Sequence, residues 1–154
     1  MRLPAPGLTR EARVRVEVGP VHTLGPTPAG LRRIVPITGG AVEGGRLTAE
    51  ILPGGADWQL VQDDGTTVID TRYTARTPDG ALIYLATRGI RHGPPATLDR
   101  VAAGEPVDPG EYYFRVHVHL EASAPAYAWL NRSLFVAYAA RLADAVVYDL
   151  YSLD

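Results

Sequence analysis

The sequence has no cysteine and no lysine, and these two absences restrict its chemistry. Without cysteine the chain has no disulfide, no thiolate nucleophile, no iron–sulfur cluster and no cysteine-bound zinc. Without lysine it has neither a Schiff-base amine nor the phosphate-binding lysine of a P-loop. All 15 basic residues are therefore arginine. Any fixed cation in a functional site must be arginine or histidine, and any covalent nucleophile must be Ser, Thr, Tyr, His or a carboxylate.

The chain also lacks a strong charge of either sign and a long apolar run. Its 15 basic and 17 acidic residues give a formal net charge of −2, which argues against a nucleic-acid binder with a large basic surface. No apolar run approaches the roughly 20 residues of a membrane span. Residues 1–7 include two prolines and no apolar core of a signal peptide. We therefore expect a cytoplasmic protein whose partners are neither nucleic acids nor membranes.

The length of 154 residues fits one domain, because a second would leave each half near the lower limit for a hydrophobic core. The 16 glycines and 13 prolines lie between apolar segments and form no low-complexity tract. The chain contains no internal repeat. We expect a single domain over residues 1–154, with residues 1–12 as a loose N-terminal segment.

Between the glycines and prolines, apolar residues recur with a period of two, which is the period of a β-strand. The turns Asp63–Gly65 and Pro78–Gly80 favour antiparallel neighbours. One short helix is expected over residues 96–103, closed by Gly104. The pattern predicts an all-β fold, a single antiparallel up-and-down β-barrel of eight or nine strands with one short helix. A β-sandwich is the alternative architecture.

The strand predicted over residues 111–121 separates polar from apolar side chains. Its even positions are apolar or aromatic, and its odd positions are Tyr113, Arg115, His117, His119 and Glu121. Successive side chains of a strand point to opposite faces, so these five share one face. That face is either the solvated outside of the barrel or a polar lumen that holds a small ligand. The second interpretation makes Tyr113, Arg115 and Glu121 candidate catalytic groups.

His117 and His119 have the spacing of a metal-binding pair on one strand. Glu121 lies close enough in sequence to be a third ligand, but His22 and His92 belong to no second motif. Surface histidines are therefore favoured, and we expect no metal site. The glycine pairs match no dinucleotide-binding fingerprint, so we expect no cofactor.

Two further segments carry candidate groups. Asp57–Trp58 follows the turn at residues 53–56 and is either a ligand-facing pair at a barrel mouth or a core tryptophan beside a turn-capping aspartate. Arg88 lies in a stretch over residues 87–95 that holds a second arginine and a histidine. Arginine side chains beside a glycine-rich backbone suit anion recognition, although arginines in loops also serve solubility.

Several short motifs occur in order: Ile37–Gly40, Pro53–Trp58, Thr71–Tyr73, Asp79–Tyr84, Glu111–Arg115 and Tyr127–Val136. Together they make the chain similar, from about Val18 to its end, to the bacterial and fungal family called domain of unknown function 3237. The resemblance implies a compact antiparallel barrel of the calycin or allene-oxide-cyclase-like type. It implies no particular activity, but it directs attention to the motif positions Asp57, Trp58, Tyr113, Arg115, Trp129 and Asn131.

The leading hypothesis is a cofactor-independent enzyme that isomerises, cyclises or eliminates a small organic molecule by general acid–base catalysis in the barrel lumen. The catalytic candidates are Asp57, Tyr113, Arg115 and Glu121, and the substrate-binding candidates are Trp58, Arg88, His119, Trp129 and Asn131. The alternative is a non-catalytic carrier of a small apolar or aromatic ligand. A homodimer that buries Val14, Val16 and Val18 or the last strand is compatible with both hypotheses.

Overall fold

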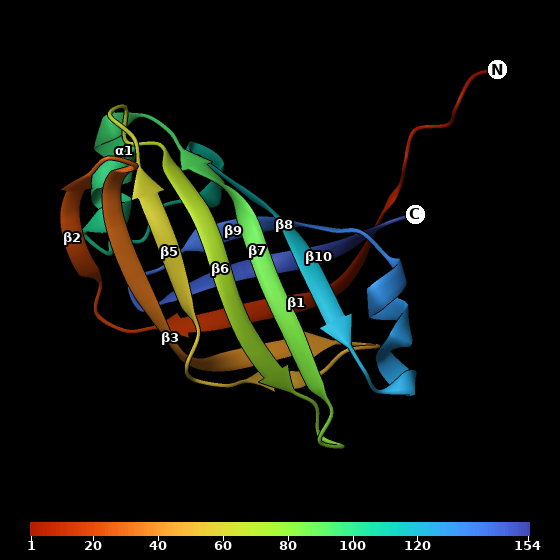
Figure 1. Ribbon diagram of the computed structural model, residues 1–154. Coiled ribbons are helices and arrows are strands. Elements are labelled where there is room, and N and C mark those ends of the chain that lie inside the picture. Colours follow the sequence, from red (N-terminus) through yellow and green to blue (C-terminus); the bar gives the residue numbers. More distant parts are fainter.

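Ten antiparallel β-strands make up most of the computed structural model, which describes residues 1–154 (Figure 1). The strands are β1 (Leu8–Val18), β2 (His22–Thr27), β3 (Gly30–Gly44), β4 (Ala49–Ile51), β5 (Ala56–Val61), β6 (Thr67–Arg76), β7 (Leu82–His92), β8 (Tyr113–Ala122), β9 (Phe135–Arg141) and β10 (Ala145–Leu153). The helices are α1 (Pro95–Ala102) and the 3₁₀ segments η1 (Pro109–Glu111) and η2 (Pro125–Arg132). The prediction of an all-β antiparallel barrel is confirmed.

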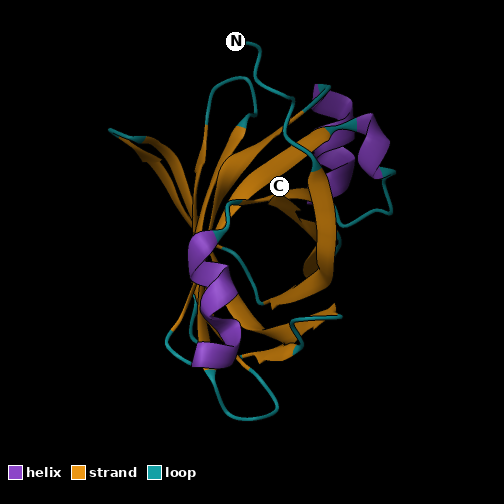
Figure 2. Ribbon diagram, turned by 90° about the vertical axis from the view of Figure 1, so that its right-hand side faces the viewer, coloured by secondary structure: helices purple, strands orange, loops and turns teal.

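The barrel is a closed ring of eight strands, with β2 and β4 as additional strands beside it. Strand β1 pairs with β10 on one side and with β3 on the other, and this second pairing closes the ring. Figure 2 shows the strands arranged in a ring. Closure leaves the sheet without the long unpaired edges that a sandwich would retain.

Strand β3 is long because it serves two parts of the ring. Its residues 31–36 pair with β5, and its residues 37–44 pair with β1. The change of partner falls next to Gly39 and Gly40, and Gly40 has a φ of +132°, which L-residues with a side chain rarely adopt. Glycine kinks of this kind let a sheet turn a corner and close.

The two ends of the barrel are different. Segment η2 lies at one end, where Leu130 is fully buried in the hydrophobic core. Helix α1 lies at the opposite end (Figure 1), where it lines an open cleft. None of the helices has the length and apolarity that crossing a membrane would need. The open cleft therefore lies at the α1 end.

Two details differ from the predictions. Strand β1 begins at Leu8, so the loose segment expected over residues 1–12 stops before that residue, because residues 8–12 pair with β10. The predicted short helix is present as α1, but Tyr127 and Trp129 lie in η2, a second helical segment that the sequence did not predict. Prolines at the start of both segments favour a helical first turn.

Candidate functional site

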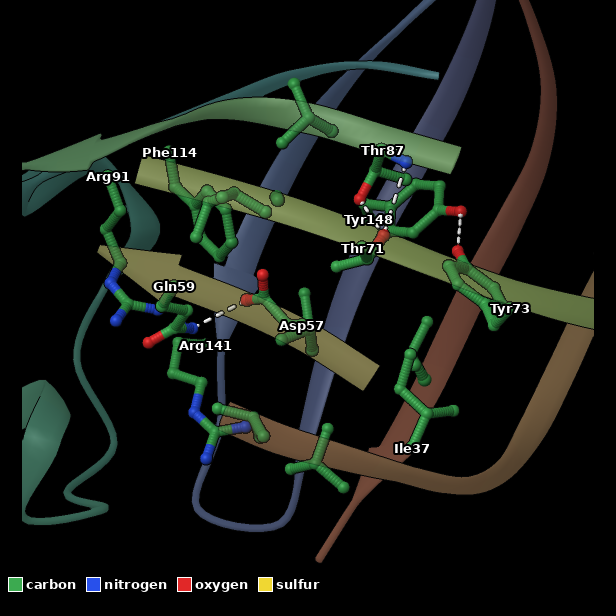
Figure 3. Close-up of a pocket in the computed structure, with 17 residues that line it drawn as sticks. Ile37, Asp57, Gln59, Thr71, Tyr73, Thr87, Arg91, Phe114, Arg141 and Tyr148 are labelled. Atoms are coloured by element: carbon green, nitrogen blue, oxygen red, sulfur yellow. Dashed lines mark hydrogen bonds between the residues drawn. The ribbon is translucent and has the colours of Figure 1, made fainter. Parts of the chain in front are cut away.

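The lumen of the barrel is a narrow cavity, and Figure 3 shows the residues that line it. Some of these residues also line the cleft at the α1 end. The centre of a water-sized sphere can move through a volume of about 40 Å³ inside this cavity. Most of its lining is apolar and includes Val16, Val35, Ile37, Ile69, Phe114 and Val116. A small set of polar side chains interrupts this lining, which is the usual composition of a small-molecule site.

Asp57 is the only carboxylate among the residues that line the lumen. It is 8% exposed, because strand alternation turns Asp57 inward from β5 and its neighbour Trp58 outward. Its carboxylate accepts hydrogen bonds from Gln59 Nε2 at 2.6 Å and from the backbone N–H of Asp70 at 3.0 Å. Burial raises the pKa of Asp57 above its ordinary value, although both hydrogen bonds oppose the rise. A carboxyl group with a raised pKa is suited to exchange protons near neutral pH.

Three arginines lie at the mouth of the lumen. Arg33 Nη2 donates a hydrogen bond to Gln59 Oε1 at 2.7 Å. The amide of Gln59 therefore links the guanidinium of Arg33 to the carboxylate of Asp57. Arg91 is 7% exposed, and its Nη1 has no hydrogen-bond partner. Burial, together with repulsion from Arg33 and Arg141, lowers the pKa of Arg91 to about 10. The three guanidinium groups therefore form a concentrated positive charge, with Asp57 as the carboxylate facing them.

A second polar group lies on the other side of Asp57 from Arg91 and Arg141 (Figure 3). The hydroxyls of Tyr73 and Tyr148 are joined by a hydrogen bond of 2.5 Å, and both tyrosines are buried. Burial raises the pKa of both phenols, so they remain protonated. Only one of the two hydroxyl protons is needed for the bond between them, and the other is free to donate to a ligand oxygen.

A wider cleft lies outside the mouth, between the barrel and α1. Its volume on the same measure is about 480 Å³. It shares Val35, Gln59, Arg91 and Arg141 with the lumen, so these residues form the throat between the two spaces. The outer part of this cleft carries the carboxylates of Asp63, Asp64 and Asp99. The cleft therefore carries acidic side chains as well as the arginines of the throat.

The structure places the polar face of the strand at residues 111–121 outside the barrel. Tyr113 is 45% exposed, and His119 and Glu121 are exposed beside it on β8. Arg115 lies on the same outer face, with its Cζ 3.2 Å from the ring centroid of Tyr138. The interpretation of this face as a polar lumen is wrong, because Phe114, Val116 and the other even positions occupy the interior. The solvated outer face, the other interpretation, is what the structure shows.

His119 Nε2 is 2.8 Å from Glu121 Oε1, and this pair lies in the open on the outer surface. No group of three or more His, Cys, Asp or Glu side chains is arranged to hold a metal ion. His117 and His119 are therefore exposed side chains on the outer surface of β8.

The remaining candidate residues also lie away from the lumen. Trp58 packs on the outside of β5 near Arg72, whose Cζ is 5.8 Å from its ring. Arg88 is exposed and pairs with Asp70 at 3.4 Å. Trp129 lies at the η2 end under Arg46, 3.8 Å from its Cζ. Their predicted role in shaping or charging the pocket is not supported by these positions.

Asn131 has a structural position instead of a ligand-facing one. Its Nδ2 donates to the carbonyl of Ala122 at 2.7 Å, and its Oδ1 accepts from the backbone N–H of Ala122 at 2.8 Å. These two bonds fasten η2 to the end of β8. The prediction that Asn131 orients a substrate oxygen is therefore wrong, because Asn131 lies at the η2 end of the barrel, away from the lumen.

The site contains residues that the sequence analysis missed. The sequence alone suggests a loop for Arg91, whereas β7 continues to His92 and turns Arg91 inward with Ile83, Leu85 and Thr87. The period of two that begins at Ile83 was the signal that could have found it. Arg141 follows Phe135, Ala137 and Ala139 in the same way on β9. Arg91 and Arg141 are thus polar residues at the ends of apolar alternations that line this lumen.

Asp57 is expected to make the barrel less stable as the pH rises, relative to an Asp57→Asn variant. Its pKa is raised in the folded protein, whereas in the unfolded chain it is about 3.9. Its stabilising contribution is fully present below the unfolded pKa and is lost as the pH rises through the folded pKa. Urea denaturation of both proteins from about pH 4 to pH 8 measures this. The free energy of unfolding of the variant, minus that of the wild type, should increase as the pH rises.

The comparison of the two proteins isolates Asp57 from the other carboxylates. Glu11 and Asp149 have lowered pKa values because Arg46 and Arg13, respectively, donate hydrogen bonds to them, so their contributions have the opposite sign. Both proteins share these contributions, which cancel in the difference. A difference that does not change with pH would contradict the burial of a titrating carboxyl at position 57.

Comparisons with known proteins agree with this barrel. A family model described as "Protein of unknown function (DUF3237)" matches residues 6–153. A UPF0311 protein of Rhodopseudomonas palustris strain TIE-1 is 39% identical over 140 residues, which are 91% of this chain and 92% of that protein. The crystal structure of a beta-barrel like protein from Acinetobacter baumannii AYE has a TM-score of 0.87 and 48% identity, covering 99% of each chain.

Two more distant proteins come from fungi. PR-toxin biosynthesis cluster protein 7 of Penicillium roqueforti is 29% identical over an alignment of 149 positions that covers 83% of this chain and 79% of that protein. A crystal structure described as an enzyme from Penicillium herquei has a TM-score of 0.75 and 19% identity, covering 100% of this chain and 98% of that chain. This last likeness concerns the fold.

Proposed function

The chain belongs to the family described as protein of unknown function DUF3237, and from that premise we propose that it is an enzyme that moves a proton on a small organic molecule in the barrel lumen. Asp57 is the proposed general acid–base group. The reaction class is an isomerisation, a cyclisation or an elimination, in each of which one positioned carboxyl group can remove and return a proton.

The observation that carries this proposal is the environment of Asp57. Its carboxyl group is buried in a mostly apolar cavity, with Gln59 and a backbone N–H holding both oxygens in place. A purely structural carboxylate in a core is normally paired with a cation by hydrogen bonds, whereas Asp57 has none to an arginine. The raised pKa of Asp57 is what a general base or acid near neutral pH requires.

The other polar groups of the lumen suit the charges that such a reaction develops. In an isomerisation, Asp57 would remove a proton from a carbon next to a substrate carbonyl and become protonated. The electron pair of the broken C–H bond would move onto the carbonyl oxygen, where the Tyr73–Tyr148 pair has a proton to donate. In a substrate with a C=C bond next to that carbon, the electron pair would return from the oxygen to re-form the C=O bond and shift the C=C bond. The far alkene carbon would then take the proton back from Asp57, which regenerates the carboxylate.

The fungal relatives support an enzymatic role without naming a reaction. One carries the name of a toxin biosynthesis cluster, and the structure of another barrel of this fold is described as an enzyme. Small-molecule biosynthesis is consistent with a narrow lumen of this composition.

A non-catalytic carrier is the second candidate, and one observation favours it. Nine of the 17 residues that line the lumen are aliphatic or phenylalanine, and the rings of Tyr73 and Tyr148 add apolar surface, so burial of an apolar ligand would itself stabilise a complex. A carrier would hold its ligand without turnover and would need no titratable group at position 57.

The experiment that separates the two candidates follows chemical change directly. Wild-type protein and the Asp57→Asn variant are incubated in D₂O with a panel of small enolisable acids and ketones and with a bacterial metabolite extract. Mass spectrometry then detects new products and deuterium taken up from the solvent. We expect the wild type to change at least one compound and the variant to change none. Equal conversion by both proteins would refute the proposal, and a bound compound that neither changes would favour the carrier.

A further inference from the structure

We propose that the substrate is an organic carboxylate whose acid group is bound at the throat by Arg91 and Arg141, with its apolar body in the lumen. This inference rests on the proposed function for the reaction itself, but the binding site follows from separate residues. Figure 3 shows both arginines entering the cavity from the same side, next to Gln59.

The first step concerns the unpaired hydrogen-bond donors. Arg91 Nη1 and Arg33 Nε are buried and have no hydrogen-bond acceptor. A guanidinium group buried without a partner costs free energy, and the side chain of Arg91 is only 7% exposed. Arg141 also lines the throat, and its side chain donates no hydrogen bond to the protein. These donors are placed for an acceptor that the protein does not itself supply.

The second step concerns charge. Three guanidinium groups converge on a region where Asp57 is the one carboxylate of the lumen, and Asp57 binds its proton more tightly than usual. An anion at the throat would therefore relieve repulsion among Arg33, Arg91 and Arg141. Planar guanidinium groups suit a carboxylate because its two oxygens accept two parallel N–H donors.

The third step concerns the direction in which the ligand lies. Outside the throat, the cleft carries Asp63, Asp64 and Asp99, which would repel any further negative charge on the ligand. Inside the throat, the walls are mostly apolar. The body of the ligand is therefore expected to point inward, past Asp57 and toward the Tyr73–Tyr148 hydroxyls. A single carboxylate on a small apolar body matches the charges at the throat and the mostly apolar walls behind it.

The test measures binding, by isothermal titration calorimetry, of benzoate and of its uncharged analogue benzamide. The wild type should bind benzoate about ten- to a hundred-fold more tightly than benzamide, as a buried hydrogen-bonded charge predicts. Both Arg91→Gln and Arg141→Gln should lose most of this preference. Arg76→Gln removes the same charge from an exposed position outside the lumen and should retain the preference. Circular dichroism establishes which variants are folded. If only one of Arg91→Gln and Arg141→Gln folds, that variant alone is sufficient for the test.

Equal binding of benzoate and benzamide to the wild type, or no binding of benzoate, would overturn the inference. So would a preference that survives in the folded throat variants. Phenyl phosphate is the further probe. If it binds more tightly than benzoate, the inferred carboxylate substrate is wrong and a phosphate ester is indicated instead. Because these probes report binding alone, their outcome is independent of turnover. Loss of turnover in Asp57→Asn without carboxylate binding would leave the proposed enzyme intact and refute only the substrate class.

Discussion

Replacing Asp57 with asparagine is expected to lower kcat by about 10²- to 10⁴-fold, with a much smaller change in KM. Asparagine keeps the size of the side chain and retains an oxygen that can accept a hydrogen bond from Gln59 or from the backbone N–H of Asp70. It cannot accept a proton from a substrate. The loss should therefore fall on the chemical step, and steady-state kinetics on the compound identified by mass spectrometry measure it.

The matched controls are carboxylate and phenol groups on the outer face of β8. Glu121→Gln and Tyr113→Phe remove a titratable group from exposed positions and should leave kcat within about two-fold, as surface changes away from a site usually do. The pH profile gives a second readout. If Asp57 acts as the base, activity rises as the pH passes upward through its raised pKa, and the variant lacks this rise. An Asp57→Asn enzyme with wild-type kcat would remove the basis of the proposed mechanism.

Replacing Gly40 with alanine is expected to reduce the free energy of unfolding by about 2–6 kcal/mol, or to prevent folding. Gly40 has a φ of +132°, and a Cβ there would lie 2.0 Å from the carbonyl oxygen of Arg15 on β1. Strands β1 and β3 would have to separate where they close the ring. Urea denaturation followed by circular dichroism measures the loss.

Two other glycines separate the causes of this effect. At Gly45 an added Cβ has open space and an ordinary φ, so Gly45→Ala should change stability by less than about 0.5 kcal/mol. At Gly54 the space is also open but φ is +114°. Gly54→Ala should therefore reduce the free energy of unfolding by the cost of backbone strain alone, about 1–3 kcal/mol. A Gly40→Ala protein as stable as Gly45→Ala would show that the close approach of β1 and β3 is not needed for closure.

Much of the fold was predictable from the chain because strand alternation is a local property. The period of two in β1, β6 and β8 reports which residues share a face, whatever surrounds the strand. Alternation alone does not say which face of β8 is inside, since an apolar lumen and an apolar outer contact produce the same pattern. The catalytic interpretation of Tyr113, Arg115 and Glu121 was wrong for this reason.

The site was only partly predictable. Asp57 was identified from its place beside a tight turn and a tryptophan, and it is the one candidate of the sequence analysis that lines the lumen. Arg91 and Arg141 lie at the ends of β7 and β9, fifty residues apart in sequence, and nothing local marks them as neighbours of Asp57. Their cluster depends on how far each strand extends toward the α1 end.

The sequence by itself determined that the chain forms antiparallel strands, that any fixed cation is arginine or histidine, and that no thiol or amine chemistry is available. The tertiary structure decided which of the 15 arginines lie beside the lumen, because closure of the ring turns Arg91 and Arg141 toward it and leaves Arg88 and Arg115 on the outer face. Burial makes an unpaired charge costly, and only the folded barrel determines which charges are buried.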